Sequence, residues 1–306
     1  MRNVKPVKVG NCTLDGSHIY IQSMLNVPAE NVEATVAQAV ALEAAGCEII
    51  RAAIPTLDAV RLIPAIKEKI RIPLVADIHF DYRIALESAA AGVDKIRINP
   101  GNIGDMDRVR QVAQACKSKN IPIRIGVNSG SLEKEILAKY GSPTPEALVE
   151  SAMHHAAMLE QFDFEDIVIS IKSSDVDRMI DSYRLAAEKC SYPLHLGVTE
   201  AGTFLPGTVR SSVALGILLE EGIGDTIRVS LTEAPENEIP TAQLLANHFT
   251  HRTGSFEVKY PERYSPYAYR RRTNIQVPIV HDEEMSGMRI IEAVSENPTA
   301  ELRAAI

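Results

Sequence analysis

Several common patterns are missing from this 306-residue sequence, and each absence excludes a class of protein or site. The four cysteines, at positions 12, 47, 116 and 190, include no C-x-x-C pair, which excludes a local zinc or iron–sulfur motif. No apolar run reaches the roughly 18 residues of a membrane span, and the first ten residues hold no apolar signal core. The net charge of −8 argues against a protein that coats nucleic acid. We therefore expect a cytoplasmic protein with reduced, mostly buried thiols.

Eight short apolar runs, separated by helix-like segments, occupy the sequence up to residue 232, and each ends in a polar or charged cluster. Runs rich in Val, Ile and Leu are typical of parallel strands that helices cover. Eight strands with eight crossovers predict a (β/α)8 TIM barrel, whose active site lies where the strands end. The runs are residues 19–24, 47–54, 73–79, 95–100, 122–128, 166–172, 193–200 and 226–232.

Helices are predicted between and after these strands, and the first two carry clear end signals. Gly46 ends the first helix, and Thr56 is an N-cap for the second. The alternative architecture, an open doubly wound sheet, normally has a glycine-rich loop after its first strand. That strand continues here as QSMLN, which favours the barrel. The predicted helices are residues 30–45, 57–69, 81–91, 106–119, 145–161, 174–189, 209–222 and 235–248.

The two ends of the chain have a different character. The residues before the first strand predict a small hairpin, with its turn at Asp15-Gly16, that closes the bottom of the barrel. After residue 250 the sequence is rich in Tyr, Arg and Pro. We therefore divide the chain into a diphosphate-binding barrel, residues 1–250, and a short incomplete extension, residues 251–306, that is too small for an independent domain. An aromatic-basic segment can stack on nucleic acid, but docking between domains fits it better.

Charged residues recur at the strand ends. Side chains alternate between the two faces of a strand, so Asp77 and His79 share one face, as do Arg97 and Asn99. If these faces point inward, cations from five strands meet at one end of the barrel, and a multiply charged anion, most simply a diphosphate, is needed to offset them. Arginine forks bind phosphate in bidentate fashion. The alternative is that each cation points outward into a surface ion pair. The five cations are Arg51, Arg97, Arg124, Lys172 and Arg228.

Glu200, which ends the seventh run in VTEAGT, has two interpretations. A carboxylate beside a cationic site can act as a general acid or base, or it can be the counter-ion of Lys172 or Arg228. His79 is either an acid or a simple hydrogen-bonding residue, and the sequence does not separate the two. The glycines of PGNIG, residues 100–104, would let backbone amides approach a phosphate.

Five long motifs carry a family resemblance: VADIHFDYRIAL, KIRINPGNIG, IRIGVNSGSLE, HLGVTEAGT and GIGDTIRVSLT. They closely resemble the barrel domain of the 4-hydroxy-3-methylbut-2-enyl diphosphate synthases, flavodoxin- or ferredoxin-dependent oxidoreductases of the methylerythritol phosphate route to isoprenoids. The resemblance implies a two-electron reductive ring opening and dehydration of 2-C-methyl-D-erythritol 2,4-cyclodiphosphate. In the family a [4Fe-4S] cluster carries the electrons.

The resemblance also implies roles for single residues. Glu200 would be the acid–base or positioning carboxylate. The diphosphate would be held by Arg51, Arg97, Asn99, Arg124, Asn128, Lys172, Arg228 and Ser230, with Asp77 and His79 in the same site. The family usually has threonines after Gln-Ser-Met, where this chain has Leu25-Asn26-Val27, and this departure bears on any hydroxyl contact from the first strand.

A second departure concerns the cluster. The family's cluster domain follows the barrel and supplies three cysteines, two of them as C-x-x-C, and a glutamate, and this sequence has no match to them. The stretch YSPYAYRRRT and the following VPIV look like the opening of a domain that the longer, three-domain form inserts before the cluster domain. We therefore expect no metal ligands and no stable cluster in this chain, and no turnover by the chain alone.

The expected partners are a small cyclic diphosphate, flavodoxin or ferredoxin as electron donor, and either a second copy of the chain in a homodimer or a separate cluster-domain chain. No nucleic acid and no membrane are expected. Two other functions stay open. One is a non-catalytic barrel that binds or senses the cyclodiphosphate without a cluster. The other is a barrel enzyme for another phosphorylated substrate, such as a pterin synthase, which fits the cations but not the specific motifs.

Overall fold

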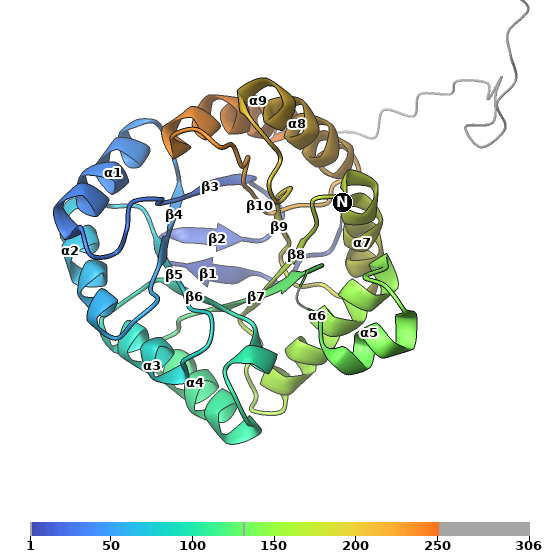
Figure 1. The fold of residues 1–306 in the computed structure, drawn as a ribbon, viewed down its shortest axis with the longest axis horizontal. Coiled ribbons are helices and arrows are strands. Elements are labelled where there is room, and N and C mark those ends of the chain that lie inside the picture. Colours follow the sequence, from blue (N-terminus) through green and yellow to red (C-terminus); the bar gives the residue numbers. More distant parts are fainter. Residues whose placement is uncertain (1, 131, 251–306) are drawn as a thin grey trace, which may run out of the picture. The chain divides into compact units, whose positions relative to one another are not determined.

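The computed structural model describes residues 2–130 and 132–250. In this part, eight parallel strands form one sheet in the order β8-β7-β6-β5-β4-β3-β10-β9. A parallel bridge between Ile169 and Leu194 joins β8 to the segment before β9 and closes the sheet into the predicted barrel (Figure 1). The strands are β3 (Tyr20–Met24), β4 (Ile49–Ala53), β5 (Leu74–Asp77), β6 (Lys95–Ile98), β7 (Ile123–Asn128), β8 (Ile167–Lys172), β9 (His195–Leu196) and β10 (Thr226–Ile227).

Helices form a ring outside the strands (Figure 1). Several begin at a side-chain cap, as when Asn31 accepts from Ala34 N and Asp175 accepts from Arg178 N. The predicted cap Thr56 accepts from Ala59 N, and Gly46, with φ +95°, follows α1 as predicted. The helices are α1 (Val32–Ala44), α2 (Leu62–Lys69), α3 (Tyr82–Ala90), α4 (Met106–Ser118), α5 (Lys134–Tyr140), α6 (Pro145–Glu160), α7 (Val176–Lys189), α8 (Phe204–Glu220) and α9 (Ile239–Thr250), with short 3-10 turns η1 (Asp58–Arg61), η2 (Pro100–Asn102) and η3 (Pro235–Glu238).

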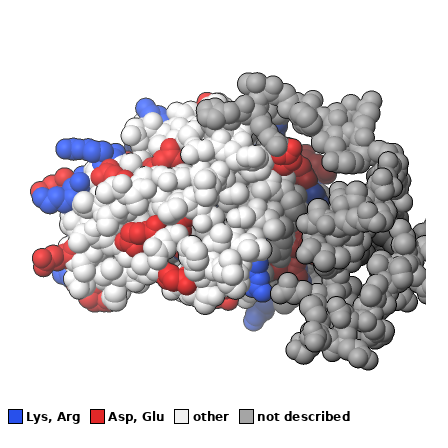
Figure 2. Space-filling model, turned by 90° about the horizontal axis from the view of Figure 1, so that it is seen from above, with Lys and Arg blue, Asp and Glu red and all other residues white. Residues whose placement is uncertain are grey.

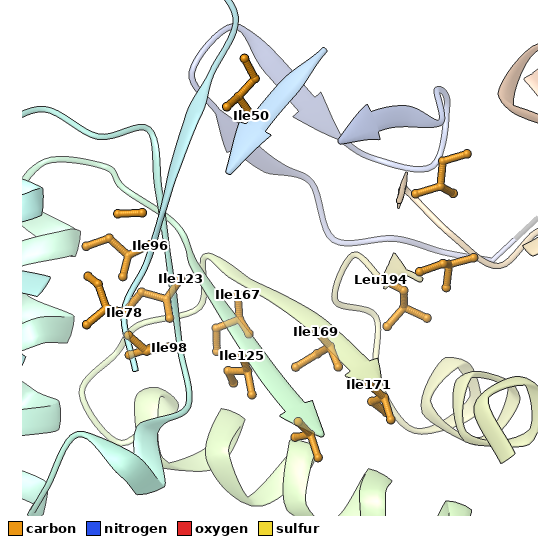
Figure 3. Close-up of a cluster of buried hydrophobic side chains, with 14 of the residues drawn as sticks. Ile50, Ile78, Ile96, Ile98, Ile123, Ile125, Ile167, Ile169, Ile171 and Leu194 are labelled. Carbon is orange, nitrogen blue, oxygen red and sulfur yellow. The ribbon is translucent and has the colours of Figure 1, made fainter. Parts of the chain in front are cut away.

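The outer face of the sheet is apolar and packs under the helices. On β6, Ile96 and Ile98 point to this layer and alternate with Lys95 and Arg97. Isoleucines of the neighbouring strands continue the layer, as Figure 3 shows. Because the helices take the apolar face, the charged residues of the same strands are left to the inside of the barrel.

A two-stranded hairpin, β1 (Val7–Val9) and β2 (Cys12–Leu14), lies at the centre of the ring in Figure 1. Val7, Val9 and Leu14 pack with Val168 of β8 and close one end of the barrel interior. The hairpin itself is as predicted, but its turn is not at Asp15-Gly16. Val9 pairs with Cys12, so the chain reverses at Gly10-Asn11. Gly10 has φ +55°, a conformation that glycine adopts without strain.

Other boundaries also differ from those predicted. β9 and β10 have two residues each, because the chain leaves the sheet soon after His195 and Thr226. The helix expected over 209–222 begins at Phe204, and α5 was not expected. The helix expected over 235–248 divides into η3 and α9.

None of the described helices has the length and apolar character that crossing a bilayer requires. On the uncovered part of the face drawn in Figure 2, acidic and basic side chains lie in small groups and form no continuous basic patch. The predicted extension, residues 251–306, lies outside the described residues.

Candidate active site

The carboxyl ends of β5 to β8 bring most of the predicted residues together. Asp77, Arg97 and Arg124 are neighbours in register on β5, β6 and β7. Further along the same strands, Asn128 of β7 lies opposite Lys172 of β8. The sheet pairing therefore places these side chains on adjacent strands at one end of the barrel.

Asp77 is the centre of this group. Its Oδ1 accepts a hydrogen bond from Arg97 Nη1 at 3.1 Å, and its Oδ2 lies 3.5 Å from Arg51 Nε. His79 Nε2 lies 3.7 Å from the same Oδ2. Burial alone would raise the pKa of Asp77, but Arg51, the His79 contact and Arg97 hold it well below its usual range. Asp77 is therefore ionised and orients two arginines.

Arg97 needs a glycine beside it. Its Nη2 donates to Gly126 O at 3.3 Å. A Cβ at position 126 would lie 2.3 Å from Arg97 Nε, so only glycine leaves space for this guanidinium. Gly126 therefore has a packing role that the sequence pattern did not reveal.

Two further cations are fully buried. Arg124 and Lys95 have no exposed surface, and their side-chain nitrogens have no hydrogen-bond partner among the described residues. Burial, then the charges of Arg51 and Arg97, holds the pKa of Arg124 well below its usual range. Burial and the charge of Arg124 lower the pKa of Lys95 to about 7. Sequence reasoning missed Lys95, although its spacing of two from Arg97 places both on one face.

Arg228 has a carboxylate partner that the sequence did not suggest. Its Nη2 lies 3.3 Å from Oε1 of Glu238, a buried residue of η3. Glu238 Oε2 also accepts from Ser23 Oγ at 3.0 Å, and Oε1 accepts from Leu231 N at 3.2 Å. No ion pair joins Glu200 to Arg228 or Lys172 within residues 2–130 and 132–250, so the counter-ion of Arg228 is Glu238.

The remaining predicted residues lie around the rim. Asn99 is buried and its Oδ1 accepts from Gly101 N at 3.2 Å, which shapes the loop after β6. Ser230 is partly buried beyond the end of β10. His79 and Glu200 are exposed, and Glu200 has φ +52°. A left-handed backbone at a non-glycine residue is strained and often marks a functional position.

The site carries more positive than negative charge. Its six cations, which we call the cationic cluster, are Arg51, Lys95, Arg97, Arg124, Lys172 and Arg228. The buried carboxylates that contact them are Asp77 and Glu238. Burial and the surrounding arginines also hold the pKa of Lys172 well below its usual range. An anionic ligand would offset this excess of positive charge and favour the charged forms of these side chains.

A contact between His155 and Glu133 supports two of the loops that follow the strands of the site. His155 of α6 is buried, and its Nε2 lies 2.6 Å from Oε1 of Glu133, in the loop between β7 and α5. Ser151 Oγ donates to the other Glu133 oxygen at 2.8 Å. A Cβ at Gly101, in η2, would lie 2.7 Å from His155 Nε2. His155 thus contacts the loops that follow both Asn99 and Asn128.

Comparisons with known proteins identify the family of this barrel. Residues 4–243 match the family model described as the GcpE TIM-barrel domain. The chain belongs to the GcpE family. Among its relatives, the Clostridium perfringens 4-hydroxy-3-methylbut-2-en-1-yl diphosphate synthase (flavodoxin) is 57% identical over 81% of this chain and 71% of that protein. The synthase of the same name from Lysinibacillus sphaericus is 54% identical over 81% of this chain and 67% of its own length.

A comparison with solved structures shows the fold of this GcpE barrel. The Yersinia pestis dihydropteroate synthase aligns with a TM-score of 0.57 at 16% identity, over 79% of this chain and 98% of that one. The corresponding enzyme from Vibrio fischeri ES114 gives 0.56 at 13% identity, over 82% and 100%. At such low identity the likeness shows the TIM-barrel fold alone.

The cysteines of this GcpE chain do not fit a [4Fe-4S] cluster. Cys12, Cys47 and Cys116 are buried at separate positions in the barrel. Burial raises the pKa of Cys12 to about 11 and those of Cys47 and Cys116 to about 12. A cluster binds thiolates, and these environments disfavour them. In the described part of the chain, no three His, Cys, Asp or Glu side chains gather as metal ligands.

Proposed function

We propose that this chain is the substrate-binding barrel of a cytoplasmic 4-hydroxy-3-methylbut-2-en-1-yl diphosphate synthase. The reaction would open the ring of 2-C-methyl-D-erythritol 2,4-cyclodiphosphate at a carbon–oxygen bond and release one hydroxyl as water. It consumes two electrons and two protons, with flavodoxin or ferredoxin as the electron donor. Because this chain's cysteines do not fit the cluster, the electrons would reach the substrate through a group held elsewhere.

The observation that carries this proposal is the excess of charge in the cationic cluster. Asp77 and Glu238 orient three of its arginines but leave the other cations without carboxylate partners among the described residues. A cyclic diphosphate would supply the missing negative charge. Desolvated guanidinium–phosphate contacts are among the stronger polar interactions in proteins.

The other rim residues would complete the site. Asn99, Asn128 and Ser230 would donate hydrogen bonds to phosphate or hydroxyl oxygens. Glu200, on its strained backbone, would hold or move a proton at the substrate, or position the ring. His79, which faces Asp77, would contact the same ligand from the exposed side.

Calorimetric titration of the chain with the cyclodiphosphate, in the absence of iron, tests the proposal. We expect a dissociation constant in the micromolar range, with an affinity that falls as salt screens the charges. Titration with a neutral polyol of the same carbon number is the control. Absence of cyclodiphosphate binding would refute the role of the cationic cluster.

The separate positions of the cysteines also favour a second candidate, a barrel that binds or senses the cyclodiphosphate without converting it. The two differ when reductant and a cluster-bearing domain of a relative are added. Product formation would establish the enzyme role, whereas binding without any turnover would favour the sensor.

A further inference from the structure

A cavity of about 430 Å³ opens beside the cationic cluster and is not explained by a five-carbon ligand on the arginines. We call it the side cavity. It lies between the loop after β3 and the end of β4, and most of its lining is apolar. Its lining includes Met24, Asn26, Ala29, Thr35, Ala53 and Arg228.

The polar groups of the lining do not call for a polar ligand. Asn26 Oδ1 already accepts from Gln38 Nε2 at 2.7 Å, and Thr35 Oγ1 donates to Asn31 O at 2.8 Å. Glu30 is exposed, so its carboxylate stays in water. What remains for a ligand is the apolar surface, with Arg228 as the cation of the lining.

Met24 is the wall shared by the side cavity and the cationic cluster. Its Sδ lies 3.1 Å from Arg51 Nε and 3.7 Å from Arg228 Nη1, and the same side chain lines the side cavity. Methionine is flexible and adapts its shape to a neighbouring apolar group. A diphosphate on Arg51 and Arg228 would therefore lie beside this apolar cavity, with Met24 between them.

We propose that the side cavity takes the hydrocarbon chain of diphosphate esters longer than the five-carbon reactant, with their diphosphate on the cationic cluster. Such prenyl-type esters would compete with the cyclodiphosphate and inhibit the barrel. The inference rests on the proposed diphosphate site and adds a second class of ligand to it. The volume lies within the range of small-molecule pockets, and each methylene moved from water into it strengthens binding.

Titrations of the full chain with inorganic pyrophosphate, dimethylallyl diphosphate and geranyl diphosphate test the proposal. We expect geranyl diphosphate to bind at least tenfold more tightly than dimethylallyl diphosphate. It should also displace the cyclodiphosphate in competition. Ala29→Leu, which fills the cavity, should abolish the gain with chain length and leave pyrophosphate affinity unchanged. Ala29→Ser, which adds little volume, is the matched control, and Ala53→Val is a second filling variant if the first unfolds.

The outcomes separate this inference from the proposed function. If pyrophosphate binds but chain length has no effect, the side cavity takes no chain and the diphosphate site stands. If the gain with chain length survives in both filling variants, the chain lies elsewhere and the inference is wrong. If none of the three diphosphates binds, the diphosphate site itself is refuted, and the inference with it.

Discussion

Arg97 keeps its orientation because Gly126, beside it, has no Cβ atom. Alanine at position 126 would place a Cβ 2.3 Å from Arg97 Nε and force the guanidinium away from Asp77. We expect Gly126→Ala to weaken cyclodiphosphate binding by about 2–4 kcal/mol, close to the effect of Arg97→Ala, because both remove a desolvated arginine–phosphate contact. Calorimetric titration measures this. Gly130→Ala is the control, since a Cβ there meets no atom within 4 Å. Equal affinities for all variants would exclude Arg97 from the ligand site.

Lys95 should make the stability of the protein depend on pH. Burial lowers its pKa in the folded chain to about 7, whereas a lysine in the unfolded chain titrates near 10.4. Between these values the unfolded state binds the extra proton, so the free energy of unfolding rises with pH. We expect Lys95→Met to stabilise the protein at pH 7 by about 1–4 kcal/mol, with a smaller gain at pH 10. Urea denaturation at both pH values tests this, with the exposed Lys8→Met as control. A gain that grows with pH would contradict it.

Glu200 should matter for conversion and not for affinity. It is exposed and has no ion pair to the cationic cluster within the described residues, so neutralising it removes no ligand contact that the cluster needs. We expect Glu200→Gln to keep cyclodiphosphate affinity within about threefold and to lower turnover at least about 100-fold. The assay uses the barrel completed with a cluster-bearing domain and a reductant. Full turnover by the variant would show that the carboxylate only shapes its loop.

The sequence revealed the charged residues of the site better than their partners. Side chains alternate between the two faces of a strand, and the Val and Ile residues of β6 and β7 occupy the outer face. This alternation was enough to place Arg97 and Arg124 on the inner face of the sheet. Glu238 follows the last strand in a 3-10 turn, where no periodicity indicates which way a side chain points. Its contacts with Ser23 and Arg228 depend on closure of the barrel, which local sequence does not describe.

At the level of elements, the Glu133–His155 pair joins helix α6 to the loops that follow β6 and β7. Burial alone would raise the pKa of Glu133, but its contact with His155 helps to lower that pKa to about 2, so the carboxylate is charged. We expect His155→Gln to weaken cyclodiphosphate binding about tenfold through the displaced loops of Asn99 and Asn128.

A double-mutant cycle with Asn99→Ala shows whether His155 acts through that residue. Non-additive losses in affinity are expected if it does, whereas additive losses would indicate a purely structural role. The exposed neighbour His154→Gln is the matched control, and it should change neither affinity nor stability.

Element boundaries were harder to predict than element types. The apolar runs at 193–200 and 226–232 gave the correct strand positions, but only two residues of each stay in the ladder. The following residues instead form loops, held for example by Thr232 N donating to Gly202 O at 3.2 Å. Such contacts join segments that are distant in sequence, so periodicity alone does not indicate where a strand stops.

For the whole molecule, the hairpin is part of the barrel's core. Leu14 is fully buried and packs with Val7, Val9 and Val168. We expect Leu14→Ala to lower the free energy of unfolding by about 2–5 kcal/mol, because it leaves a cavity between the hairpin and β8. Denaturant titration measures the loss. Thr13→Ala, an exposed position on the same strand, should stay within about 0.5 kcal/mol. Similar values for the two variants would mean that the hairpin is not part of the cooperative unit.

The position of the hairpin also determines how molecules move through the barrel. Val7, Val9 and Leu14 close one end of the barrel, so a ligand enters and leaves through the opposite end. Reactant and product must therefore pass through the same opening, one after the other. A product or a bulkier ester that dissociates slowly therefore delays the binding of the next reactant.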